Sequence, residues 1–310
     1  MDITIFPWKL SGSISVIPSK SQAHRYLICA ALSDNETELL CPETSRDMDA
    51  TADCLRALGA KIERTSWGYR VTPIPQVPER ALLPCRDSGS TLRFLLPVAG
   101  ALGVDATFQM EGRLPQRPLS PLWEEMERMG CILSRPTPDT IRCQGRLRPG
   151  TYTIPGNISS QYITGLLFGL SLLDGHSSIE ITGKLESMPY VTMTQQAMSM
   201  FGVKTENFAV KGAQKFCSPG KLQVEGDWSN SAFWIAANAL GCSLTVDNLN
   251  RNSPQGDRAA AQLLPLIREE HCSIDASDIP DLVPIMAVMA AASHGAVFKI
   301  KFRHTITSYR

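Results

Sequence analysis

The hydrophobic and polar positions of the chain follow one pattern that recurs along its length. A short polar segment leads into a strongly apolar helix, a glycine or Asp-Gly turn follows, and then a stretch rich in strand-forming residues. Five such apolar helices are predicted, at residues 26–32, 92–102, 163–173, 232–240 and 282–292. Their polar starts are 67, 72, 69 and 52 residues apart, counted from Ser21 through Ser88, Ser160 and Ser229 to Asp281.

A second, amphipathic helix lies between successive copies of the apolar one. Three of these helices end in a similar way, at Gly59, Gly130 and Gly202, which are 71 and 72 residues apart. A glycine at this point is typical of a left-handed helix C-cap that leads into a strand. The fourth amphipathic helix, predicted at residues 258–270, lacks the glycine, and its repeat is the short one.

Each repeat therefore reads as strands plus two helices, one buried all round and the other buried on one face. A period of about 70 residues is too long for the helical repeats of a solenoid, so packed α/β modules fit better. Ser218, Pro219 and Gly220 mark a boundary, with three units before it and nearly two after it.

Composition narrows the class of protein. The 310 residues are 43% hydrophobic and 19% charged, and 30 basic residues balance 30 acidic ones. Because the chain has no net charge, we expect no overall electrostatic field that would attract nucleic acid or an anionic membrane. The nine cysteines form no Cys-x-x-Cys pair and are odd in number, which indicates reduced thiols. No signal peptide and no apolar run of about 18 residues is seen, so a cytoplasmic protein is expected.

The polar starts of the buried helices are the candidate chemistry. For any single start, ordinary N-capping is the simpler interpretation. Several starts nevertheless combine free backbone N–H groups, hydroxyls and a cation, which suits an anion site. Lys20 with Arg25, Arg93 after residues 88–90, and residues 159–161 are three such starts. The segment 111–118 adds two arginines on a loop fixed by prolines. If the units converge, these groups would surround a multiply charged small molecule.

Six segments, in order along the chain, carry a family resemblance. They are Pro18–Arg25, Asp87–Arg93, Gly112–Pro118, Ser159–Gln161, Asn252–Asp257 and Pro280–Leu282. Together they resemble the signatures of 5-enolpyruvylshikimate-3-phosphate synthases, with Asp87 where the family usually has asparagine. The resemblance implies an α/β, enolpyruvyl transferase-like fold of two domains built from repeated βαβαββ units. Residues 18–220 would form the complete three-unit domain, and residues 1–17 with 221–310 an incomplete second domain.

The resemblance also implies the reaction and its site. The enolpyruvyl group of phosphoenolpyruvate would pass to the 5-hydroxyl of shikimate 3-phosphate, with release of phosphate and without a metal or organic cofactor. Lys20 and Asp281 would be the catalytic residues, Lys20 assisting proton transfer and Asp281 acting as base. Gly89 and Arg117, with Lys20, would bind phosphoenolpyruvate. The shikimate 3-phosphate subsite would comprise Ser21, Arg25, Ser159, Ser160, Gln161, Ser187, Tyr190 and Asp281.

Two alternatives stay open from the sequence. The related enolpyruvyl transferase of peptidoglycan synthesis typically has Lys-Asn at the first signature and a cysteine in its mobile loop. This chain has Lys20-Ser21 and no cysteine between residues 111 and 120, which favours the shikimate family. The family's later Lys-Glu-Ser/Thr-Asp-Arg segment has no match after Gly295. A truncated, inactive shikimate-3-phosphate-binding protein of the same fold is therefore the second hypothesis.

An incomplete second domain has a physical consequence. Its apolar helix faces are expected to lack part of their cover, in particular at Phe233, Ile235, Ile285, Val288 and Met289. The family is expected to be monomeric, and self-association through this domain is the expected departure. No nucleic-acid or membrane partner is expected.

Overall fold

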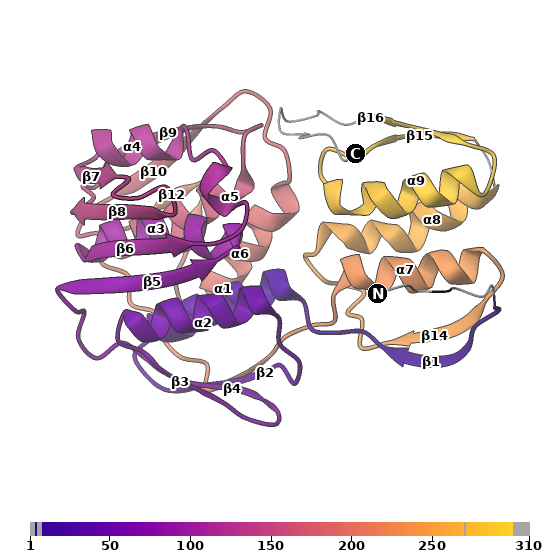
Figure 1. The fold of residues 1–310 in the computed structure, drawn as a ribbon, viewed down its shortest axis with the longest axis horizontal. Helices are drawn as coiled ribbons and strands as arrows, with labels where there is room; N and C mark the ends of the chain where they lie inside the picture. The colour runs from indigo at the N-terminus through magenta and orange to yellow at the C-terminus, as the bar shows by residue number, and fades with distance from the viewer. Residues whose placement is uncertain (1–3, 5–7, 270, 300–310) are drawn as a thin grey trace. The chain divides into compact units, whose positions relative to one another are not determined.

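The computed structural model describes residues 4, 8–269 and 271–299, and its chain divides into two compact units (Figure 1). We call Lys20–Val224 the continuous domain, and Met1–Ser19 with Glu225–Arg310 the discontinuous domain. The sequence placed these divisions at residues 17/18 and 220/221. In the structure the continuous domain begins two residues later and ends four residues later.

The continuous domain contains the predicted repeat three times. The first copy comprises α1 Lys20–Ala31, β2 Thr37–Leu40, α2 Arg46–Ala57, β3 Lys61–Arg64 and β4 Gly68–Thr72. The second comprises β5 Arg80–Arg86, α3 Gly89–Leu102, β6 Asp105–Met110, η1 Leu114–Gln116, α4 Leu122–Arg128, β7 Cys131–Ser134 and β8 Thr140–Gly145. The third comprises β9 Thr151–Pro155, α5 Ser160–Ser171, β10 Ser177–Thr182, α6 Met188–Met200, β11 Thr205–Glu206 and β12 Ala209–Val210.

The three sheets of this domain share one topology. With β13 at Lys221–Gln223, their strand orders are β13-β2-β4-β3, β5-β6-β8-β7 and β9-β10-β12-β11, each with one parallel pair followed by antiparallel neighbours. The first sheet takes its outer strand, β13 Lys221–Gln223, from the far end of the domain, where Leu222 lies opposite Leu39. This pairing explains why the domain extends past residue 220.

The apolar helices α1, α3 and α5 lie inside the domain, as their all-round hydrophobic surfaces predict. Two glycines of α5 allow it to approach α3 closely. A Cβ added at Gly165 would lie 2.2 Å from the backbone oxygen of Arg93, and one at Gly169 would lie 2.7 Å from that of Pro97. Among the described residues, no helix is long and apolar enough to cross a membrane.

The predicted glycine helix ends are confirmed. Gly59, Gly130 and Gly202 follow α2, α4 and α6 with φ of 109°, 112° and 79°, in the region where a side chain is disfavoured. After α2, the N–H of Ala60 donates to the carbonyl of Leu55. Such bonds satisfy the last carbonyls of a helix and turn the chain toward the next strand.

The discontinuous domain has two parallel strand pairs and three longer helices in its described residues. Its elements are β1 Ser11–Ser15, α7 Trp228–Ala239, β14 Ser243–Asp247, η2 Gly256–Ala259, α8 Ala260–Glu269, β15 Cys272–Asp275, η3 Pro280–Leu282, α9 Val283–Ala291 and β16 Ala296–Lys299. β1 pairs with β14, and β15 with β16. The helices pack around Leu264, Ile267, Met286 and Met289.

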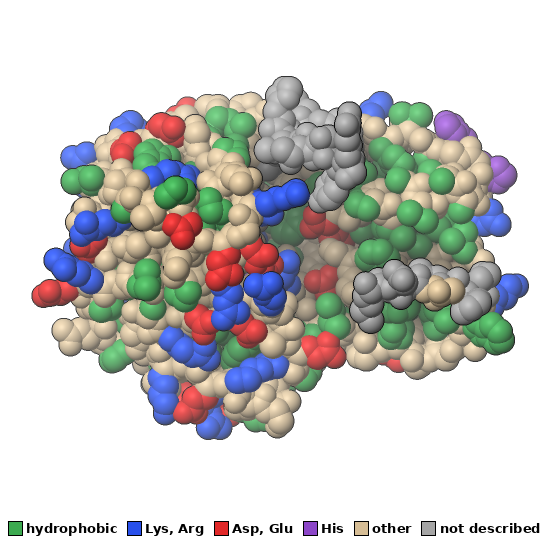
Figure 2. All heavy atoms as spheres, viewed as in Figure 1, with side chains coloured by type: hydrophobic (Ala, Val, Ile, Leu, Met, Phe, Trp, Pro, Cys, Tyr) green, Lys and Arg blue, Asp and Glu red, His purple; other side chains and the backbone are tan. Residues whose placement is uncertain are grey.

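The expectation of uncovered apolar side chains is correct for some positions and wrong for others. Phe233 and Val288 are 58% and 56% exposed, whereas Ile285 and Met289 are buried because they face the core of this domain. Ile235 is partly buried. Figure 2 shows hydrophobic side chains gathered on the face over α8 and α9.

Candidate functional site

Lys20, the first residue of α1, carries the first predicted cation. Its Nζ lies 2.7 Å from Oδ2 of Asp47 in the first turn of α2, and the Lys20 side chain is 48% exposed. A half-exposed ammonium keeps most of its hydration, so the pair itself adds little stability. Lys20 therefore remains accessible to an anionic ligand, and Asp47 fixes its orientation.

Arg25, one turn later, lies inside the domain with only 2% of its surface exposed. Nε donates to Oγ1 of Thr194 at 2.8 Å, Nη1 to the carbonyl of Ser21 at 2.6 Å and Nη2 to the carbonyl of Tyr190 at 2.9 Å. The guanidinium also lies 5.1 Å from the ring centroid of Phe94. Burial lowers its pKa to about 10, which still leaves it charged at neutral pH. Arg25 thus ties α1 to α6 and brings a buried positive charge to their contact.

The start of α3 places two further cations against a glycine. Ser88 caps the helix, its side chain accepting from the N–H of Thr91 at 3.3 Å. A Cβ added at Gly89 would lie 2.5 Å from Nη1 of Arg93 and 3.1 Å from Nη1 of Arg117. Both guanidinium groups therefore lie against the same backbone position. Two adjacent guanidinium groups at a helix N-terminus create a field that favours an anion there.

Gln161 joins this helix start to that of α5. Its Oε1 accepts from Nη1 of Arg93 at 3.0 Å, and its Nε2 donates to Oγ of Ser90 at 3.1 Å. Ser159 caps α5 by accepting from the N–H of Gln161, and Ser160 beside it is buried. The polar start predicted from the sequence is thus an N-cap and also a bridge between two motifs.

The start of α6 has an unusual backbone. Ser187 is buried and has φ 58° and ψ 36°, a left-handed conformation that a non-glycine residue seldom adopts. The surrounding structure must hold it there, because such a conformation costs of the order of 1–3 kcal/mol. The half-buried Tyr190 follows one turn later, and its carbonyl is the acceptor for Arg25.

Ten of the eleven predicted site residues lie in the continuous domain, at four helix starts and on the loop that carries Arg117. Contacts within that domain link these starts to one another. Arg25 joins α1 to α6, and Gln161 joins α5 to α3. Arg117 lies at Gly89. The eleventh residue, Asp281, belongs to the discontinuous domain, where it is exposed in η3.

Asp281 has a second carboxyl group near it within its own domain. Asp257 in η2 is 4% exposed, and its Oδ2 accepts a hydrogen bond from the hydroxyl of Ser229. The pKa of Asp257 is raised to about 6, mainly by burial and in part by the negative charges of Asp281 and Asp227, against the lowering effect of the hydrogen bond from Ser229. Asp257 lies in a family-like segment but was not predicted as a site residue, since burial of a single aspartate leaves no mark in the sequence.

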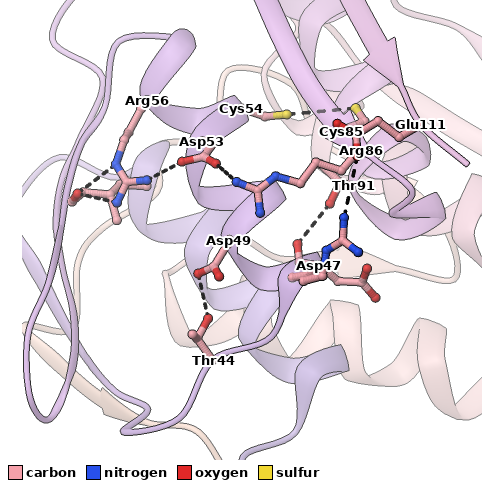
Figure 3. Close-up of polar contacts among 12 residues, drawn as sticks. Thr44, Asp47, Asp49, Asp53, Cys54, Arg56, Cys85, Arg86, Thr91 and Glu111 are labelled. Atoms are coloured by element: carbon pink, nitrogen blue, oxygen red, sulfur yellow. Dashed lines mark hydrogen bonds and ion pairs between the residues drawn. The ribbon is translucent and has the colours of Figure 1, made fainter. Parts of the chain in front are cut away.

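The sequence also missed the residues of α2 that support the site. Figure 3 shows Thr91 of α3 bonded to Asp47, and Arg86 of β5 bonded to Asp53. The hydrogen bond from Oγ1 of Thr91 to the backbone oxygen of Asp47 is 3.4 Å long, and the ion pair between Arg86 and Asp53 is 2.5 Å. These contacts hold α2 against the second repeat. The pattern of α2 predicts an amphipathic helix and does not reveal which of its polar residues face the site.

Comparisons with known proteins identify the family and the fold of the chain. Residues 6–268 match the family model of EPSP synthase (3-phosphoshikimate 1-carboxyvinyltransferase). The 3-phosphoshikimate 1-carboxyvinyltransferases of Clostridium kluyveri and Clostridium acetobutylicum are each 37% identical over 318 aligned positions, covering 94% of this chain and 74% of the relative. A solved EPSP synthase from Acinetobacter baumannii superposes with a TM-score of 0.76 at 19% identity, covering 94% of this chain and 73% of that one. The predicted fold is thereby confirmed, and the chain belongs to the EPSP synthase family.

Proposed function

We propose that this chain transfers the enolpyruvyl group of phosphoenolpyruvate to the 5-hydroxyl of shikimate 3-phosphate and releases phosphate. Family membership supports the reaction. The observation that carries its assignment to particular residues is the linkage of four motif-bearing helix starts through Arg25, Gln161 and Arg117 within one domain. Both substrates are polyanions, and this linkage supplies cations and helix N-termini suited to them.

Shikimate 3-phosphate is proposed to bind at the starts of α1, α5 and α6. Ser21, Ser159, Ser160, Gln161 and Ser187 offer hydroxyl, amide and backbone donors, and Tyr190 offers a ring hydroxyl. Arg25 supplies the buried positive charge behind them. Its hydrogen bonds to other described residues use four of the five N–H groups of the guanidinium, so its main effect on the ligand is electrostatic, with one Nη1 N–H left among these contacts for a direct bond.

Phosphoenolpyruvate is proposed to bind beside Gly89. The absence of a side chain there lets an anion approach the backbone and the guanidinium groups of Arg93 and Arg117 together. Lys20, accessible and oriented by Asp47, would donate a proton to the enolpyruvyl group during addition. Asp281 would accept the proton of the 5-hydroxyl as its oxygen forms the new C–O bond. Loss of a proton from the resulting methyl group to the Lys20 amine, together with cleavage of the C–O bond to phosphate, would then restore the double bond and complete the transfer.

Phosphate release with both substrates present tests the proposal. Arg117→Ala should lower kcat/KM with phosphoenolpyruvate by about 10- to 100-fold, as expected for a lost charge-assisted contact. Arg113→Ala, on the same loop and also exposed, is the matched control and should be near neutral. Equal losses in the two variants would contradict the assignment of Arg117. Binding of shikimate 3-phosphate by the chain without any phosphate release would favour the non-catalytic binding hypothesis.

We also propose that the protein acts in the cytoplasm and is a monomer at low concentration. The free state of all nine cysteines supports a reducing compartment, with six of them buried. Burial raises the thiol pKa of Cys41 to about 12 and that of Cys29 further, so these groups stay as unreactive thiols. The exposed apolar side chains of the discontinuous domain support self-association at higher concentration.

A further inference from the structure

A line of buried polar side chains connects the first three helices of the continuous domain. Nδ1 of His24 lies 2.7 Å from Oγ1 of Thr51, and Oγ1 of Thr51 lies 2.7 Å from Oγ1 of Thr91. Oγ1 of Thr91 is in turn 2.8 Å from Oγ of Ser88, the cap of α3. All four residues are at most 2% exposed, so water does not compete for these bonds.

Both ends of this line lie at residues of the proposed site. His24 is one turn from Lys20 on α1, and Ser88 immediately precedes Gly89 on α3. The middle of the line is attached as well, because the hydroxyl of Thr91 also reaches the backbone oxygen of Asp47 at 3.4 Å (Figure 3). Asp47 is the partner of Lys20. The line therefore fixes the Lys20–Asp47 pair relative to the backbone at Gly89.

The environment of His24 determines which group donates and which accepts in each hydrogen bond of the line. Burial lowers the pKa of His24 to about 3, so the ring is neutral at physiological pH and carries one N–H. Its Nε2 is buried with no hydrogen-bond partner among the described residues. An unpaired buried N–H is rarer than an unpaired acceptor, so the proton belongs on Nδ1. Nδ1–H then donates to Thr51, Thr51 donates to Thr91, and Thr91 donates to Ser88 or Asp47.

We propose that Thr51 is a positioning residue of the enolpyruvyl transfer site, its hydroxyl joining His24 to Thr91 so that Lys20 and Gly89 keep their separation. This inference rests on the proposed function. Thr51 is the member of the line that lies on α2, and its hydroxyl bonds to His24 of α1 on one side and to Thr91 of α3 on the other. Removing its hydroxyl would leave the Nδ1–H of His24 and one side of Thr91 unpaired.

The test uses two changes at this position and a matched control elsewhere. Thr51→Val removes the hydroxyl with little change of shape, and Thr51→Ser keeps the hydroxyl and loses a methyl group. Thr37→Val removes the hydroxyl of another fully buried threonine of the same domain. Thr37 lies on strand β2, and its Oγ1 is 2.7 Å from Oγ of Ser218. Thermal unfolding, calorimetric affinity for shikimate 3-phosphate and for phosphoenolpyruvate in its presence, and the ¹⁵N shifts of His24 are measured for each.

We expect Thr51→Val to weaken phosphoenolpyruvate binding by about 5- to 30-fold, as for a buried hydrogen bond left half unmade. Thr51→Ser should stay within about threefold of the parent, since it retains that bond. Thr37→Val should lower the melting temperature without changing either affinity. Equal affinities for Thr51→Val and the parent, or an affinity loss in Thr37→Val as large as in Thr51→Val, would overturn the inference.

The NMR measurement separates this inference from the proposed function. In the parent chain, the ¹⁵N shifts of His24 should report a neutral ring protonated at Nδ1. The amide shifts of Ser88 and Gly89 should change in Thr51→Val and should stay unchanged in Thr51→Ser. An Nε2–H tautomer in the parent, or unchanged amide shifts of Ser88 and Gly89 in Thr51→Val, would refute the proposed chain of hydrogen bonds from His24 to Ser88. Failure of the parent chain to bind shikimate 3-phosphate, with these shifts as expected, would refute the proposed function and with it the role of Thr51 in that site. If Thr51→Val does not fold, the ¹⁵N shifts of His24 in the parent chain still test the proposed chain of hydrogen bonds.

Discussion

The buried carboxyl group of Asp257 should make the stability of the discontinuous domain depend on pH in an unusual direction. Its pKa rises from the ordinary value of 3.8 to about 6, first because of burial and then because of the charges of Asp281 and Asp227. Between these two values the folded state holds a proton that the unfolded state has lost. The free energy of unfolding therefore falls as pH rises from about 4 to about 6, and then stays level with respect to this group.

The magnitude follows from the shift. A shift of about two pKa units, at about 1.4 kcal/mol each, gives a cost of up to about 3 kcal/mol above pH 6. Asp257→Asn cannot ionise and still offers an oxygen to the hydroxyl of Ser229. We expect it to stabilise the domain by about 1–3 kcal/mol at pH 7.5 and by much less at pH 4.

Urea unfolding followed by tryptophan fluorescence measures this effect, since Trp228 lies buried in α7 of the same domain. Asp247→Asn, at an exposed position on β14, is the control and should change the unfolding free energy little at either pH. The reasoning is refuted if Asp257→Asn destabilises the domain at pH 7.5, or if its effect is the same at pH 4 as at pH 7.5.

Three further predictions concern packing and surface. Gly165→Ala should destabilise the continuous domain by about 1–3 kcal/mol, because its Cβ would meet the backbone oxygen of Arg93 at 2.2 Å, and an unchanged denaturation midpoint would contradict this. Gly89→Ala should displace only the flexible ends of Arg93 and Arg117, so the melting temperature should change little while the KM for phosphoenolpyruvate rises; a large loss of stability at unchanged KM would argue against it. Replacing exposed Phe233 and Val288 by lysine should reduce self-association in sedimentation velocity, and the expectation fails if the parent is already a concentration-independent monomer.

Local signals allowed much of the fold to be predicted. The glycines that close α2, α4 and α6 follow from backbone sterics, and the all-round apolar helices could lie only in a core. The pairing of β13 with β2 was not predictable in this way. It joins a three-residue strand to a partner about 180 positions earlier, and so short a segment has no periodicity of its own.

The residues of the candidate site come mainly from sequence motifs, and physical reasoning from the sequence alone indicated fewer of them. The polar starts of the apolar helices indicated Lys20, Gly89 and Gln161, because hydroxyls, cations and glycine that recur at several helix N-termini favour anion binding. The partners that orient them were missed. Asp47 and Thr51 lie on an amphipathic helix whose pattern reports only which face is buried, and the burial of Arg25 depends on α5 and α6, far away in the sequence.

Phosphorus NMR of the chain mixed with phosphoenolpyruvate and shikimate 3-phosphate tests the central claim most directly, because it reports substrates, product and released phosphate in one sample. The account predicts that the phosphoenolpyruvate signal decays while inorganic phosphate and a new phosphate monoester signal from the enolpyruvyl product grow in equal amounts. Both substrate signals persisting unchanged at stoichiometric protein concentration, in a sample whose folding is verified by circular dichroism, would contradict enolpyruvyl transfer by this chain.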